Sequence, residues 1–402
     1  MNTELATKRR FVLVLGLLTG LAAVSIDMSL PAIPEMVRSL GTDMPTGQQI
    51  IGLFLAGIAL GQFPAGLMSD RYGRMPVLYT GVGIFVLAGI ASAVAGQIEL
   101  ILVARFVQGI GASVGVVVSR AIVRDITSGK QAARMLSVMV MIFTAAPMLA
   151  PVIGALLVTH YGWRMPFVAV TIFGAILFIS VSSVLRETHV PNREHHIIRH
   201  LLMSIREFFG HRQSILGVLL VLLPAAGFMA LITGSAALII EVYAIDVRYF
   251  GYIFALAGFA ILTGSMLNRH LLHHFSGMQM MRVGAVLIGV AGVQMLFFAW
   301  LGQPNFWWVW GTVCLFMVGT GFLMPNATAL ALDPVPKVAG VAASILGTIQ
   351  NFAGATSAIV SSAMYDGTIL NMVLFMGVFG IATCVTFFLR GVVLGGRPLY
   401  ED

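Results

Sequence analysis

Charged residues are scarce in this chain. Asp, Glu, Lys and Arg make up 10% of its 402 residues, whereas hydrophobic residues make up 58%. An ordinary globular domain holds about 25% charged residues, so most of this chain cannot face water. The composition therefore excludes a soluble globular protein.

Metal-binding and catalytic patterns are scarce as well. The two cysteines, Cys314 and Cys384, both lie in apolar runs, which predicts packing and no disulfide framework. His196 and His200 are four residues apart, but no Glu completes a His-Glu-x-x-His pattern, so we expect no metal site. The sequence holds no P-loop, no nucleophile elbow and no paired catalytic carboxylates within its apolar runs. We therefore expect neither an ATP-driven pump nor an enzyme, and no cofactor.

Long apolar runs dominate the chain instead. About 20 apolar residues suffice to cross a bilayer as a helix, and twelve stretches reach that length. They are apolar throughout and do not alternate, which indicates helices and not a β-barrel. The predicted fold class is an all-α membrane protein with twelve transmembrane helices. The predicted spans are residues 11–33, 46–69, 75–96, 99–121, 131–158, 163–185, 213–242, 249–268, 279–301, 305–328, 338–362 and 368–390.

The basic residues gather on one side of this predicted topology. With the N-terminus inside, most Lys and Arg fall in inner loops, whereas Arg38, Arg164 and Arg248 fall outside. This asymmetry follows the positive-inside rule, so the formal net charge of +7 reflects topology and predicts no nucleic-acid partner. We expect a multi-pass membrane protein with both termini in the cytoplasm.

The chain divides into two similar halves. We predict an N-terminal six-helix bundle over residues 1–185, a linker over 186–212 and a C-terminal six-helix bundle over 213–402. The linker ends in an amphipathic pattern that favours a helix on the cytoplasmic membrane surface. GLMSDR at 66–71 is echoed by GSMLNR at 264–269, and FVQGIG at 106–111 by FMVGTG at 316–321. Such a duplication, with the binding site between the halves, is typical of transporters.

Several short motifs resemble those of a known family. GLMSDRYGRM begins at Gly66, RFVQGIG at Arg105 and APMLAPVIGA at Ala146. They are similar to the signature loop, the fourth-helix motif and the antiporter motif of the major facilitator superfamily, although Met75 stands where a basic residue is usual. DMSLPAIP from Asp27 resembles the Bcr/CflA subgroup of drug:proton antiporters. The resemblance implies two six-helix bundles related by pseudo-twofold symmetry.

For the signature loop, the resemblance implies a conformational latch. It places Arg74 against Asp125 at the cytoplasmic end of the fourth span, and Asp70 towards the start of the eleventh span. Such contacts would stabilise the outward-open state. The alternative is that these charges only fix the topology. The residues assigned to this motif are Gly66, Asp70, Arg71, Gly73, Arg74 and Asp125.

The antiporter motif places two prolines on one side of the fifth span. Pro147 and Pro151 are four residues apart and so share a helix face, with Gly154 nearby. Each proline removes a backbone hydrogen bond and can bend the helix. A bent face of small residues suits packing that changes during transport, although an ordinary proline kink is the alternative reading.

Asp27 and Arg105 are the acid and the base that lie well inside predicted spans. At 1.5 Å per residue, both lie about 6–7 Å beyond the membrane midplane on the outer side. They could interact directly, or through water and Gln108. A carboxyl in a cavity beside an arginine can titrate near neutral pH, so we predict proton coupling by Asp27, Arg105 and Gln108. A static ion pair is the alternative.

Together with the resemblance, these predictions imply a proton-coupled efflux antiporter of the bacterial inner membrane. We expect it to work by alternating access, as a monomer surrounded by membrane lipids. We expect small, lipophilic substrates that are neutral or carry one positive charge. Alternatives are an exporter of a sugar, amino-acid derivative or siderophore, an uptake symporter, or a receptor that transports nothing. The predicted substrate contacts are Asp27 and the soft, apolar Met28, Met141, Phe228 and Met229; packing between helices is the alternative role for the last four.

Overall fold

The predicted spans all correspond to helices in a computed structural model of the chain. The structure describes residues 9–127, 129–189, 197–302 and 304–394. The first span is α2 (Arg9–Ser29), which continues through the 3-10 turn η1 (Leu30–Ala32) into α3 (Ile33–Leu40). The others are α4 (Met44–Tyr72), α5 (Arg74–Val94), α6 (Ile98–Ile126), α7 (Gly129–Tyr161), α8 (Met165–Val184), α10 (Arg212–Ala236) with the π-helical η2 (Ala237–Val242), α11 (Val247–Leu271), α12 (Gly277–Leu301), α13 (Phe306–Leu332), α14 (Ala339–Ala363) and α15 (Leu370–Phe388).

The helix α14 differs from the other spans by its many small and polar uncharged side chains. Eleven helices in the described part are long and apolar enough to cross a membrane. The remaining predicted span, 338–362, is α14, whose 25 residues include Gln350 and Asn351 among many small side chains. Its length suffices for a span. The all-helical membrane fold is therefore confirmed.

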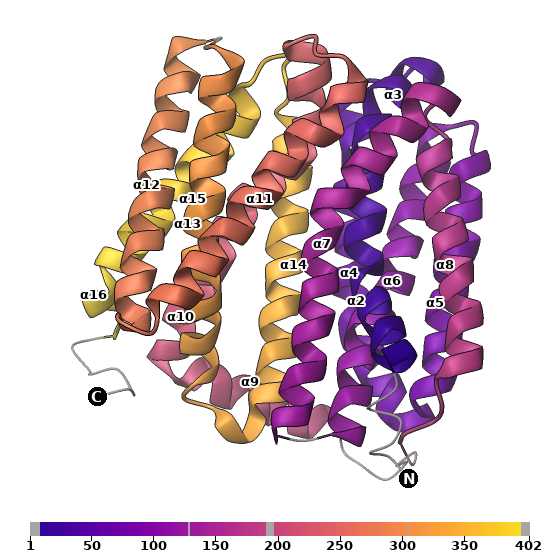
Figure 1. Cartoon of the computed structure of the whole chain (residues 1–402), viewed down its shortest axis with the longest axis vertical. Helices are drawn as coiled ribbons and strands as arrows, with labels where there is room; N and C mark the ends of the chain where they lie inside the picture. The colour runs from indigo at the N-terminus through magenta and orange to yellow at the C-terminus, as the bar shows by residue number, and fades with distance from the viewer. Residues whose placement is uncertain (1–8, 128, 190–196, 303, 395–402) are drawn as a thin grey trace. The chain divides into compact units, whose positions relative to one another are not determined.

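The helices group into two compact units. The first unit holds 1–195 together with 245–252, and the second holds 196–244 together with 253–402. In the first unit α2, α4, α5, α6, α7 and α8 lie side by side, and in the second α12, α13 and α15 do so (Figure 1). Each unit packs its own helices around small residues.

Paired glycines let the helices of each unit approach closely. A Cβ on Gly109 of α6 would lie 2.1 Å from the Phe54 carbonyl oxygen of α4, and one on Gly111 would lie 2.6 Å from the Gly81 carbonyl oxygen of α5. The FMVGTG echo behaves alike in the second unit. There the Cβ of Gly319 would lie 2.9 Å from the Gly284 carbonyl oxygen of α12, and that of Gly321 2.5 Å from the Ile261 carbonyl oxygen of α11. In each unit the two glycines of the motif approach two different neighbouring helices, although the order of the two neighbours is reversed between the units.

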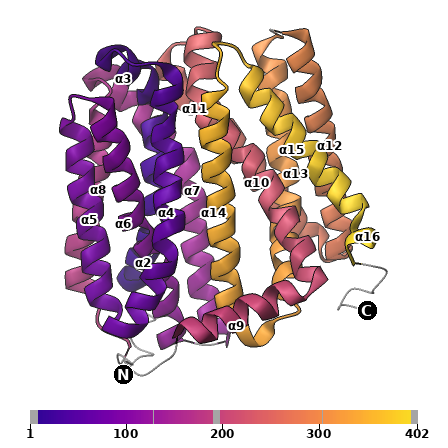
Figure 2. The ribbon, with the colours of Figure 1, turned by 180° about the vertical axis from the view of Figure 1, so that it is seen from behind.

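The predicted linker helix is α9 (Ile197–Gly210). In the second unit it lies across the ends of α10 and α14 (Figure 2). Phe208 is buried, whereas Arg206 and Glu207 are exposed, so the helix has an apolar side and a charged side. His196, one of the two histidines considered as metal ligands, lies outside the described residues. A short α16 (Arg390–Leu394) ends the described chain.

Candidate functional site

Arg105 of α6 lies in a cage of neutral groups within the first unit. Its guanidinium donates hydrogen bonds to the Ser25 hydroxyl at 2.7 Å, the Ser25 carbonyl at 3.2 Å and the Ser29 hydroxyl at 3.4 Å. It also donates to the Gln108 side-chain oxygen at 2.8 Å. Its Cζ stands 4.3 Å from the centre of the Phe54 ring, a cation–π distance. Since the residue is 1% exposed, its charge is held away from water by uncharged partners.

Asp27 lies at the same level of α2 but on another side of the helix. Ser25 and Ser29 are four residues apart and share a face, whereas a residue two positions from each points elsewhere. Asp27 is 3% exposed, and within the described part of the chain no ion pair of 4.0 Å or less joins it to Arg105. The direct form of the predicted contact is therefore wrong, because the guanidinium faces the two serines.

Gln108 connects this cage to a third helix. Its side-chain oxygen accepts from Arg105, and its side-chain nitrogen donates to the Phe85 carbonyl of α5 at 3.4 Å. The residue is 1% exposed. Gln108 therefore orients Arg105, whereas its predicted part in linking Arg105 to Asp27 stays a prediction.

The antiporter motif contacts the segment that carries Asp27. Pro31 has no N–H to donate to the Asp27 carbonyl four residues earlier, and α2 gives way to the tighter turn of η1 at this point. A Cβ on Gly154 of α7 would lie 2.2 Å from the Met28 carbonyl oxygen. Only glycine permits this approach of two backbones. Gly154 thus lies against the neighbour of Asp27, a contact that the motif alone did not predict.

The two prolines of the motif lie inside a continuous helix. Pro147 is half-buried and Pro151 is buried, and α7 extends through both from Gly129 to Tyr161. The bend expected from them, and its part in transport, stay predictions.

Arg74 forms the predicted latch contact at the other end of the first unit. Its Nε donates to Asp125 Oδ2 at 2.8 Å and its Nη2 to Asp125 Oδ1 at 3.3 Å, a two-bond arrangement. It also pairs with Asp70 and donates to the Ser69 hydroxyl at 2.8 Å. Arg74 is 4% exposed. The pairing of Arg74 with Asp125 is confirmed, whereas the contact of Asp70 with the eleventh span stays a prediction.

Glu187, which follows α8, caps the helix that begins with Arg74. Its carboxylate accepts from the backbone N–H of Arg74 at 2.9 Å and of Met75 at 3.0 Å. Partial burial acts to raise the pKa of Glu187, but the backbone N–H groups of Met75, Arg74, His189 and Thr188 outweigh it, so the pKa lies below its ordinary value of 4.5. A carboxylate at a helix N-terminus also meets the positive end of the helix dipole. Motif reasoning missed this residue, although an acid directly after a span, in a loop rich in arginine, was a usable signal.

The other residues of the signature loop differ in their roles. Gly73 has φ +99°, a conformation that favours glycine, and a Cβ there would lie 2.7 Å from Glu187 Oε2. A Cβ on Gly66 would make an ordinary 3.7 Å contact with Val117, so no steric demand for glycine exists there. Arg71 is exposed and lies 5.5 Å from the ring of Tyr72, apart from the Arg74 network.

The predicted substrate contacts divide between the two units. In the first unit Met28 is 7% exposed and Met141 of α7 is 65% exposed. In the second unit Phe228 and Met229 of α10 are half-buried, and Met229 packs against α14 at Gly354. Their contact with a substrate stays a prediction.

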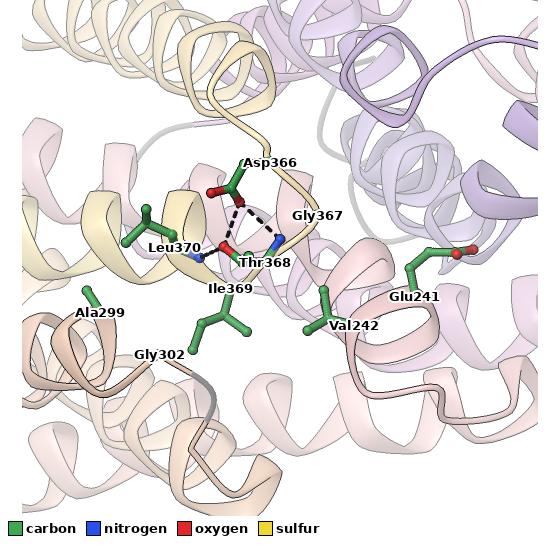
Figure 3. Close-up of a pocket in the computed structure, with 9 residues that line it drawn as sticks. All are labelled: Glu241, Val242, Ala299, Gly302, Asp366, Gly367, Thr368, Ile369 and Leu370. Carbon is green, nitrogen blue, oxygen red and sulfur yellow. Dashed lines mark hydrogen bonds between the residues drawn. The ribbon is translucent and has the colours of Figure 1, made fainter.

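A pocket of about 550 Å³ opens in the second unit between η2, the end of α12 and the start of α15 (Figure 3). Asp366 accepts from the Thr368 hydroxyl at 2.6 Å and from the Thr368 N–H at 3.0 Å, so its carboxylate is engaged in the turn before α15. Burial raises the pKa of Tyr365, and the negative charges of Glu241 and Asp366 raise it further. The pocket is negative and holds none of the predicted site residues.

Comparison with known proteins identifies the family. The family model described as Major Facilitator Superfamily matches residues 15–358. The chain belongs to this superfamily. It is 30% identical over 407 residues to the multidrug resistance protein MdtL of Klebsiella pneumoniae (strain 342), covering 98% of each chain. It is 27% identical over 384 residues to a bicyclomycin resistance protein homolog of Haemophilus influenzae, covering 94% of this chain and 95% of the relative.

Solved structures show the same fold for this superfamily member. A bacterial homolog of the human lysosomal transporter Spinster, in an inward-facing and unoccupied conformation, aligns with a TM-score of 0.77 at 16% identity, over 96% of this chain and 98% of the other. A D-xylose–proton symporter aligns with a TM-score of 0.74 at 14% identity, over 97% and 98% of the two chains. These similarities support the twelve-helix fold and carry no information on substrate.

Proposed function

We propose that this chain is a proton-coupled efflux antiporter of the bacterial inner membrane, with both termini in the cytoplasm. It exports small lipophilic compounds that are neutral or carry one positive charge. It acts as a monomer, has no catalytic site and needs no cofactor, because the proton gradient drives it. The drug-resistance names of its relatives support export.

The observation that carries the proposal is Asp27, a carboxyl 3% exposed in a span and without a salt-bridge partner among the described residues. An ionised carboxylate is costly in such a place, whereas the protonated form is neutral. Asp27 therefore suits a site that takes up a proton when closed and releases it when water enters. Ionisable groups inside membrane spans are functional candidates by default.

Arg105 holds the segment of α2 that carries Asp27. It donates hydrogen bonds to Ser25 and Ser29, which lie two residues before and two residues after Asp27. Arg105 therefore fixes the place of Asp27 relative to α6.

The same geometry favours neutral or cationic substrates over anions. Arg105 is 1% exposed, and both of its terminal nitrogens donate to neutral partners. An anion would have to displace these contacts or reach the buried Nε, which is unpaired among the described residues. A cation that approaches Asp27 would compete with the proton on its carboxyl, and this competition would couple export of the cation to uptake of a proton. Met28, Met141, Phe228 and Met229 are the proposed apolar contacts, since flexible side chains suit varied ligands.

Inside-out vesicles with an acidic lumen test this function. An antiporter moves a labelled lipophilic cation into the lumen while protons leave, a symporter drives the compound outwards, and a receptor moves nothing. Asp27→Asn should abolish gradient-driven uptake, whereas Glu99→Gln, which neutralises an exposed acid of the first unit, should not. Equal gradient-driven uptake by both variants would refute the role of Asp27.

The alternative substrates are a sugar, an amino-acid derivative or a siderophore. A matched panel of cationic, neutral and anionic compounds decides among them by binding. Tightest binding by a polyanion would contradict the charge argument.

A further inference from the structure

A second, basic pocket lies between the first turns of α2 and α7 in the first unit. Its volume is about 490 Å³. The lining residues repeat at helical spacing on both helices, so each helix turns one face to the pocket. They are Arg9, Val12 and Leu13 on α2, and Gln131, Arg134, Met135 and Val138 on α7.

The positive charge of this pocket has no acidic neighbour among the described residues. Arg9 and Arg134 are exposed, and in the part of the chain that the structure describes neither has a carboxylate within 4.0 Å. Arg74 in the same unit shows the opposite arrangement, since it is buried and doubly paired. The two guanidinium groups are therefore available to an external anion.

The walls below these arginines are apolar. Beside the polar Gln131, the pocket is lined by Val12, Leu13, Met135 and Val138, and Leu13 is 50% exposed. Arg9 and Arg134 each stand at the first residue of an apolar membrane-spanning stretch, which is the level of the lipid headgroups. A charged rim above an apolar wall matches a molecule with an anionic head and a hydrocarbon tail.

We propose that this pocket binds the phosphate of an anionic phospholipid, with Arg9 and Arg134 on the phosphate oxygens and the acyl chain against Leu13 and Val138. Arginine binds phosphate through paired N–H donors, and basic pockets between membrane helices on the cytoplasmic side take anionic headgroups. The apolar wall favours a lipid over a soluble phosphate compound. The proposal does not depend on the direction of transport, because it concerns only two arginines at the ends of their membrane-spanning stretches.

Native mass spectrometry of the delipidated full-length protein tests the site. The probes are short-chain phosphatidylglycerol, phosphatidylcholine of the same chain length, and glycerol 3-phosphate. We compare wild type with Arg9→Gln, Arg134→Gln and the double variant. Arg124→Gln is the matched control, because it removes an exposed arginine of the same unit outside the pocket.

Phosphatidylglycerol should bind with at least about tenfold lower affinity to the double variant, since one charge-assisted contact is worth more than one decade. It should bind to Arg124→Gln as to wild type. Arg9→Lys and Arg134→Lys should bind with intermediate affinity, because lysine keeps the charge and loses the paired donors; this series also excludes misfolding as the cause.

Three results would overturn the proposal. Equal phosphatidylglycerol affinity in the double variant and in Arg124→Gln would show that the pocket is not the site. If phosphatidylcholine bound as tightly as phosphatidylglycerol, the net negative charge of the lipid would not be required for binding. Equal affinity for glycerol 3-phosphate would assign the pocket to a soluble phosphate. Since binding is measured without a gradient, failure here is distinguishable from failure of the antiporter function.

Discussion

The variant Gly154→Ala tests whether α7 must touch α2 beside Asp27. The new Cβ would lie 2.2 Å from the Met28 carbonyl oxygen and 3.1 Å from its Cα, where ordinary contact begins at 3.4 Å. Both partners are backbone atoms, so no side-chain rotation relieves the clash, and the helices must separate by about 1 Å. Overpacking of this kind costs about 1–3 kcal/mol.

The same substitution at Gly20 is the matched control. Gly20 lies on α2 and faces α7, so it belongs to the same pair of helices, but its added Cβ would make an ordinary 3.8 Å contact with Ile142 of α7. Both variants gain up to about 1 kcal/mol of intrinsic helix propensity, so the difference between them isolates the clash.

Two measurements are needed, the midpoint of thermal unfolding in detergent and pH-driven transport in proteoliposomes. Gly154→Ala should unfold several degrees below Gly20→Ala and transport more slowly, because the Asp27 segment is displaced. If the two variants unfold at the same temperature and transport equally, the close approach of α7 to α2 is not required.

Three further predictions follow from the sites described. Asp27→Asn should leave the protein folded and its downhill substrate exchange intact while abolishing proton-driven transport; wild-type driven rates would contradict the proton role. Arg74→Ala or Asp125→Ala should slow the conformational cycle, measured as the transport rate, more than it weakens ligand binding, measured at equilibrium. A loss of affinity with a normal transport rate would refute the latch. Glu187→Gln should lower the free energy of unfolding by about 1 kcal/mol at pH 7. The pKa of Glu187 is lower in the folded state than its ordinary value of 4.5. Its contribution to stability is therefore present above pH 4.5 and is lost as the pH falls through the pKa of the folded state. Wild type and Glu187→Gln should become equally stable at acid pH, and a difference in stability that persists there would contradict the cap.

The number and place of the helices could be predicted from the sequence because lipid imposes a simple rule. A chain in a bilayer must satisfy its backbone hydrogen bonds within each segment, so apolar length alone reveals a span. Even α14, which contains Gln350 and Asn351, was found by its length. The pairing of Arg74 with Asp125 was implied by resemblance and is confirmed.

The partners of Arg105 could not be predicted in the same way. The sequence predicted that Asp27 and Arg105 lie at matching levels of their helices, and Arg105 does bond to residues two positions before and after Asp27. A matching level does not fix which face of α2 meets α6. Ser25 and Ser29 accept hydrogen bonds from the Arg105 guanidinium. Asp27 is two residues from each serine and therefore lies on another face of α2. Glu187 was missed for a related reason, since it lies 113 residues from Arg74 along the chain and no local spacing joins them.

Asp27 is the one carboxyl buried in the spans among the residues that the structure describes, and this sets the electrical character of the proposed cycle. One proton exchanged for a neutral molecule moves one net charge inwards, so the membrane potential adds about 2.3 kcal/mol per 100 mV to the driving force. One proton exchanged for a monocation moves no net charge, and only the pH gradient remains, worth about 1.4 kcal/mol per unit. A collapse of the membrane potential at constant pH gradient should therefore weaken resistance to neutral compounds and spare resistance to cationic ones.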